Sequence, residues 1–115
     1  MMMDCVFCRI VQGDLPSDRV LETEHVVAFR DLNPQAPTHV LVIPRRHISS
    51  LDALAADDGP ISHELLRAAR TVARSEGIDE EGYRVVTNIG DEGGQSVDHL
   101  HLHVLGGRRM GWPPG

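Results

Sequence analysis

The sequence lacks the features that would mark a membrane, secreted or nucleic-acid-binding protein. Its apolar runs are only a few residues long, whereas a membrane-spanning helix needs about 20. The start, MMMDCVFCRI, lacks the basic region and long apolar stretch of a signal peptide. Only 11 basic residues face 17 acidic ones, and the net charge of −6 disfavours nucleic-acid backbones. We therefore expect a cytoplasmic protein that binds neither membranes nor nucleic acids.

Cysteine is also scarce, since Cys5 and Cys8 are the only two. In a reducing compartment we do not expect a structural disulfide between them. Their CxxC spacing is half of a zinc site, whose other two ligands would have to be histidines. A redox pair and two small buried residues without a role are the alternative interpretations. The candidate histidines are His25, His39, His47, His63 and the histidines of residues 98–107.

Composition and patterning predict one domain that spans residues 1–115. The chain is 41% hydrophobic and 24% charged, as in ordinary globular proteins, and contains no internal repeat or linker. Pro44 would end one of the predicted strands, because proline donates no backbone hydrogen bond. The apolar alternation predicts strands in 19–31, as two runs with a turn near Glu24, and over 38–47, 83–88 and 98–106.

The segment 59–77 predicts the main helix. Pro60 suits its first turn and Gly77 its end. Its apolar residues recur at helical spacing and would share one face: Ile61, Leu65, Ala69, Val72 and Ala73. Three strands, a helix and two strands predict an α+β domain with a five-stranded antiparallel sheet.

The segment DHLHLHVLGG, residues 98–107, has a histidine at every second position. Side chains alternate between the two faces of a strand, so the apolar residues would face the core and the histidines would share the other face. Neighbouring imidazoles would then lie about 6.6–6.8 Å apart. The three histidines are His99, His101 and His103.

Three interpretations of this histidine row compete. It could be an idle polar sheet face, a metal site that uses all three imidazoles, or a site of phosphoryl chemistry with histidine as nucleophile. The preceding segment GDEGGQSV, residues 90–97, favours the third interpretation. Gly93 and Gly94 leave backbone N–H groups open to a phosphate, and Ser96 adds a hydroxyl.

If the protein both binds zinc and uses a histidine as nucleophile, different histidines of the row must serve the two purposes. A zinc-bound imidazole has committed its lone pair and cannot attack phosphorus. We therefore expect an end histidine to bind zinc while the others stay free for catalysis.

The motif HLHLHVL matches the histidine-triad signature, His-φ-His-φ-His-φ-φ with φ apolar. The chain resembles the HINT branch of the histidine triad (HIT) superfamily, the purine nucleoside phosphoramidases. The segments FRDLNPQAPTHVLVIPRRHIS (29–49), GGQSVDHLHLHVLGGR (93–108) and WPPG (112–115) are similar to that branch as well. The resemblance implies a compact α+β fold, a homodimer whose sheets join, and hydrolysis of adenosine 5′-phosphoramidates or aminoacyl adenylates to AMP, or of the guanosine compounds to GMP.

The resemblance also implies roles for single residues. His101 matches the nucleophile, and His103 matches the histidine that contacts the phosphoryl oxygens and fits the hydrolase side of the superfamily. His39 matches a histidine that supports the nucleophile. Asp31 matches the carboxylate that binds the ribose. The remaining positions would enclose the purine, lie near the phosphate and leaving group, or reach the partner's site: Phe7, Phe29, Leu32, Asn88, Gly94, Ser96 and Trp112.

The cysteine pair makes the chain similar to bacterial members of this branch. That resemblance implies a structural zinc bound by Cys5, Cys8, His47 and His99, and no catalytic metal. Asp98 departs from animal members, which tend to have an aromatic residue there. Two alternative functions remain at this stage: a dinucleoside polyphosphate hydrolase that uses the same histidine, and a nucleotide-binding or protein-interaction module.

Overall fold

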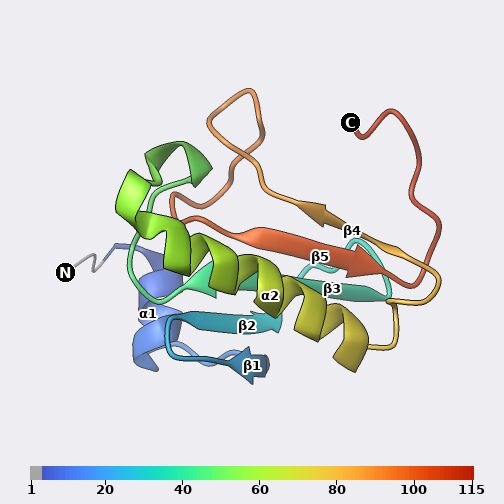
Figure 1. Cartoon of the computed structure of the whole chain (residues 1–115), viewed down its shortest axis with the longest axis horizontal. Helices are drawn as coiled ribbons and strands as arrows, with labels where there is room; N and C mark the ends of the chain where they lie inside the picture. Colours follow the sequence, from blue (N-terminus) through green and yellow to red (C-terminus); the bar gives the residue numbers. More distant parts are fainter. Residues whose placement is uncertain (1–3) are drawn as a thin grey trace.

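One antiparallel sheet of five strands, in the order β1-β2-β3-β5-β4, organises the computed structural model (Figure 1). The structure describes residues 4–115, so residues 1–3 of the predicted domain and of the segment MMMDCVFCRI lie outside the described residues. The sheet confirms the predicted α+β class. Its strands are β1 (Arg19–Glu22), β2 (Val26–Arg30), β3 (Thr38–Pro44), β4 (Tyr83–Val86) and β5 (Leu102–Gly106).

The main helix, α2 (Gly59–Ser75), lies across one face of this sheet (Figure 1). Its predicted signals are confirmed: Pro60 lies in the first turn, and Gly77, just past the end, has a φ of 73° that favours glycine. Its apolar stripe packs on the apolar side chains of β2, β3 and β5. The buried residues of the helix are Leu65, Ala68, Ala69, Val72 and Ala73.

A short helix, α1 (Val6–Gln12), contributes to a separate core that lies on the opposite sheet face. Every residue of β3 is buried, because Val40 and Val42 pack toward α2 while Leu41 and Ile43 pack with α1 residues. The sequence pattern did not predict α1 or two 3₁₀ turns, Leu51–Ala53 and Ala56–Asp58. No helix in residues 4–115 is long and apolar enough to span a membrane.

The last strand is shorter than predicted: β5 begins at Leu102, so 98–101 is not part of the ladder. The pairing with β3 stops at Val42↔Leu102, close to the predicted end of β3 at Pro44. The Leu100 N–H instead donates to the Ile48 carbonyl at 2.6 Å. The predicted alternation is nevertheless confirmed, since Leu100, Leu102 and Val104 all join the α2 core.

Gly106 allows β5 to lie close to Ile78, in the segment that follows α2. A Cβ at this position would come within 2.6 Å of Cδ1 and 2.9 Å of Cβ of Ile78. We predict that Gly106→Ala lowers the free energy of unfolding by about 1–3 kcal/mol through overpacking, measured by urea denaturation. Gly111→Ala is the control, because nothing lies within 4 Å of its Cβ position. An equal stability of the two variants would contradict this packing account.

Candidate active site

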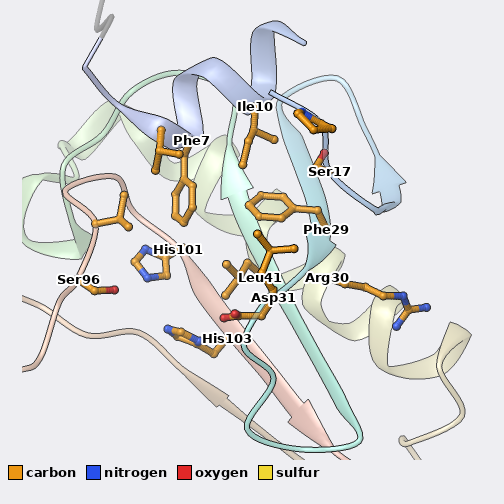
Figure 2. A pocket seen from close by; sticks show the side chains of 14 residues that line it. Phe7, Ile10, Ser17, Phe29, Arg30, Asp31, Leu41, Ser96, His101 and His103 are labelled. Carbon is orange, nitrogen blue, oxygen red and sulfur yellow. The ribbon is translucent and has the colours of Figure 1, made fainter. Parts of the chain in front are cut away.

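A cavity of about 250 Å³ opens on the sheet face that carries α1 (Figure 2). One part of its wall is apolar and comes from α1, β2 and β3: Phe7, Ile10, Phe29 and Leu41. The other part is polar and holds a carboxylate, a hydroxyl and two imidazoles: Asp31, Ser96, His101 and His103. The cavity therefore offers an apolar slot beside a set of reactive groups.

His101 presents one unprotonated ring nitrogen. Its Nδ1 lies 2.7 Å from the backbone oxygen of His99. A carbonyl can only accept, so the proton must be on Nδ1 and the lone pair on Nε2. The residue is 3% exposed, and the ring of Phe7 packs edge-on against it at 5.2 Å between centroids. The arrangement fixes one tautomer of a buried, nucleophilic imidazole.

His103 has the opposite tautomer, and a chain of two hydrogen bonds determines it. The Gln35 backbone N–H donates to Nδ1 of His39 at 3.0 Å, so His39 carries its proton on Nε2. That Nε2–H donates to Nδ1 of His103 at 2.8 Å. His103 must then carry its own proton on Nε2. The ring centroids of His101 and His103 lie 5.0 Å apart, and both residues line the cavity. The cavity wall therefore holds the unprotonated Nε2 of His101 beside the Nε2–H of His103.

His39 and His103 form a hydrogen-bonded imidazole relay, and burial keeps both rings uncharged. Burial, together with the neighbouring His101 and His39, lowers the pKa of His103 to about 4, against the opposite effect of Asp31. Burial also lowers the pKa of His39, against the opposite effect of Asp31. The Asp31 carboxylate lies 3.4 Å from Nε2 of His39 and accepts the Asn33 N–H at 2.8 Å. At neutral pH each imidazole of the relay therefore holds a single proton.

A second group of side chains next to this cavity could hold a metal. The ligand atoms of Cys5, Cys8, His47 and His99 lie within 4.8 Å of one another. Cys5 Sγ is 3.3 Å from Nδ1 of His99, and Cys8 Sγ is 3.4 Å from Nδ1 of His47. The His99 Nε2–H donates to the Pro44 carbonyl at 2.9 Å, which leaves its Nδ1 lone pair facing the thiols. Two sulfur and two nitrogen donors are a set that zinc prefers.

The side chains of Asp31, His39 and His103 also lie within 4.8 Å of one another, yet they fit a metal poorly. A metal on Nε2 of His39 would move the proton to Nδ1. That proton would then face the Gln35 N–H, donor against donor. The hydrogen bonds therefore favour a proton-holding relay at this position.

The HIT domain family matches residues 12–110 of the chain. The chain belongs to the HIT domain family. A HIT-like protein of Synechococcus elongatus is 45% identical over 115 residues and is covered completely, as is this chain. A 14 kDa zinc-binding protein of Zea mays is 49% identical over 112 residues, which cover 96% of this chain and 87% of that protein.

Solved structures of HIT proteins show the same fold. A HIT family hydrolase from Legionella pneumophila superimposes with a TM-score of 0.94 at 49% identity, over 96% of this chain and 99% of that one. A histidine triad nucleotide-binding protein from Candida albicans gives a TM-score of 0.81 at 32% identity, over 95% of this chain and 82% of that one. The resemblance to the histidine triad superfamily is thereby confirmed.

The HIT fold gathers most of the expected site residues around the cavity. It lines the cavity with Phe7, Phe29, Asp31, Leu32, Ser96, His101 and His103. His39 is not in the lining and bonds to His103, so any support that it gives to His101 passes through His103. Three other expected residues do not line the cavity of this single chain: Asn88, Gly94 and Trp112.

Other residues of the lining escaped the sequence analysis. Val6 and Ile10 belong to α1, and Leu41 is an inward residue of β3 that the pattern marks only as core. Pro16, Ser17, Arg30 and Val97 complete the lining. The FxxI spacing of Phe7 and Ile10 was the available signal for α1, because residues three apart share a helix face.

We predict that each of His39, His101 and His103 carries its proton on the ring nitrogen that its hydrogen bonds require. In ¹⁵N NMR spectra His101 should carry its proton on Nδ1, and His39 and His103 on Nε2. His103 should remain neutral until the pH falls to about 4. His25 is the internal reference, because its bond to Glu64 raises its pKa above the usual range. A His103 that titrates with or above His25, or carries its proton on Nδ1, would contradict the relay.

Proposed function

We propose that this HIT protein hydrolyses the phosphorus–nitrogen bond of purine nucleoside 5′-phosphoramidates through a covalent nucleotidyl-histidine. It would also hydrolyse the acyl-phosphate P–O bond of aminoacyl adenylates, from which the amino-acid carboxylate departs. The observation that carries the proposal is the bare Nε2 of His101 beside the Nε2–H of His103 at the polar end of an apolar slot. Relatives described as a hydrolase and as a nucleotide-binding protein support the same reaction class.

The cavity suits a purine nucleotide in one orientation. The base would lie in the apolar slot, where Phe7 and Phe29 pack edge to face at 5.5 Å between centroids. Asp31 at the rim would accept hydrogen bonds from the ribose hydroxyls, and the exposed Leu32 would cover the sugar and base. The α-phosphorus would then reach His101. Asn88 and the Gly94 N–H, on the segment before the triad, are proposed to approach the phosphate when substrate binds.

The proposed reaction has two displacements at phosphorus. His101 Nε2 forms a bond to the α-phosphorus while the bond to the leaving nitrogen breaks, and that nitrogen takes a proton and departs as an amine. Ser96 Oγ–H and His103 Nε2–H are two proton-bearing groups of the lining, and either can give that proton and regain one from the water of the second step. Water then attacks the phosphorus and the bond to His101 breaks, giving the nucleoside monophosphate. The His103 N–H stabilises negative charge on the phosphoryl oxygens, and the His99 carbonyl stabilises the charged His101 ring.

We also propose that Cys5, Cys8, His47 and His99 hold a structural zinc. The zinc-binding relative of Zea mays supports the identity of the metal. Bound zinc would supply a cross-link between the N-terminal segment, the residues after β3 and the histidine row. A site with four protein ligands has no open position for substrate, so the proposed reaction uses no catalytic metal.

We also propose that one HIT domain spans residues 1–115 and that two copies form a homodimer in which their sheets join. β4 is an edge strand with exposed Tyr83 and Val85, which suits such a joint. Trp112 is 83% exposed on the segment that leaves the sheet after β5 (Figure 1), and it would reach toward the partner's site.

We predict that His101→Ala slows amine release from adenosine 5′-phosphoramidate by at least about 10³-fold, the scale of losing a nucleophile that acts with its neighbours. His63→Ala, at an exposed position on α2, should keep the wild-type rate. Diadenosine polyphosphate at equal concentration should react more slowly with the wild type. Full activity of His101→Ala would overturn the proposed mechanism, and a preference for the diadenosine compound would change the substrate class.

We predict about one zinc per chain by metal analysis of the native protein. Cys8→Ser should lose the metal and lower the melting temperature by at least about 10 °C, because a structural metal contributes several kcal/mol to folding. Asp31→Asn should retain one zinc, because the group of Asp31, His39 and His103 is not a metal site. A metal-free wild type with unchanged melting, or zinc loss in Asp31→Asn, would contradict this assignment.

A further inference from the structure

Two of the four metal-ligand residues, Cys5 at the N-cap and Cys8 in the first turn, belong to the same short helix as part of the apolar slot. Cys5 caps the N-terminus of α1, its sulfur accepting the backbone N–H of Cys8. Phe7 and Ile10, on the same turns, line the cavity. Whatever fixes the first turn of α1 therefore also fixes one wall of the slot.

α1 needs outside contacts to hold its place. It has seven residues, whereas isolated helices shorter than about 12–15 residues are marginal in water. At its C-terminal end Arg19 donates to the carbonyls of Ile10 and Val11, at 2.5 and 3.4 Å. At its N-terminal end, the side-chain polar contacts with other parts of residues 4–115 are those of Cys5 and Cys8 with the metal-site histidines.

Phe7 connects the metal-site residues to the slot. Its ring packs edge-on against His99 at 5.8 Å, against His101 at 5.2 Å and against Phe29 at 5.5 Å between centroids. Figure 2 shows Phe7 and Phe29 on the slot side of the two catalytic imidazoles. A displacement of the first turn of α1 would move Phe7 away from the space assigned to the base.

The reactive groups also have anchoring contacts outside α1. His103 lies on β5 and bonds to His39 on β3. The segment that carries His101 is held by the Leu100 N–H on the Ile48 carbonyl and by the packing of Leu100 in the α2 core. These contacts involve no residue of α1.

We propose that the metal site acts in substrate selection: by holding α1, the bound metal forms the wall that binds the purine, and so it raises affinity for the base rather than for the ribose phosphate. This inference rests on the proposed placement of a purine in the slot. It assigns to Cys5 and Cys8 a positioning role for Phe7 in addition to their contribution to folding.

The test uses the coupling between the two ligands in the zinc-loaded protein. If zinc raises the affinity for a purine nucleotide, the nucleotide must raise the affinity for zinc by the same factor. Zinc affinity would be measured by competition with a chromogenic chelator in the presence of saturating AMP or saturating ribose 5-phosphate. AMP should tighten zinc binding about tenfold, the scale of an aromatic contact, and ribose 5-phosphate should leave it unchanged.

Two variants sharpen the test. Phe7→Ala should bind zinc yet lose the effect of AMP, whereas Leu66→Ala, an exposed apolar truncation on α2, should keep it. Equal effects of AMP and ribose 5-phosphate, no effect of either, or an AMP effect that survives Phe7→Ala would overturn the inference. Phosphoramidate turnover measured on the same samples separates the proposals: turnover without coupling rejects only this inference, and coupling without turnover rejects only the proposed reaction.

Discussion

Hydrogen bonds between imidazoles and backbone groups determine which ring nitrogens of this site carry protons. The carbonyl of His99 holds the proton of His101 on Nδ1, and the carbonyl of Pro44 holds that of His99 on Nε2. The N–H of Gln35 begins the chain that leaves His103 with its proton on Nε2. Identical side chains thereby present different atoms: a bare Nε2 on His101, a bare Nδ1 on His99 and an Nε2–H donor on His103, which suit the roles proposed for them.

The end of the sheet ladder makes these assignments possible. β3 ends at Pro44, and the pairing of β5 with β3 stops at Leu102. Beyond that point the carbonyls of Pro44 and His99 accept from imidazole rings. The alternation of side chains continues all the same, so Leu100 stays in the α2 core while His99 and His101 face the other side. One segment can therefore supply one residue of the metal site, His99, and one residue of the cavity lining, His101.

Features with a clear period were predictable from the sequence, and features that depend on distant contacts were not. The alternation in HLHLHVL, the stop at Pro44 and the stripe of α2 depend on local pattern, and the structure has all three. α1 is too short for a pattern to establish it, and its Phe7 and Ile10 gain their role only from the cavity that they line. The partner of His39 is 64 positions away, so its identity required the fold.

The stereochemical course of the reaction at phosphorus tests most directly whether the His101 nitrogen attacks the phosphorus. Adenosine 5′-phosphoramidothioate of one configuration would be hydrolysed in ¹⁸O-labelled water, and the configuration of the chiral product determined. Two in-line displacements, first by His101 and then by water, predict overall retention at phosphorus. Inversion would mean that water attacks in a single step and that no nucleotidyl-histidine forms.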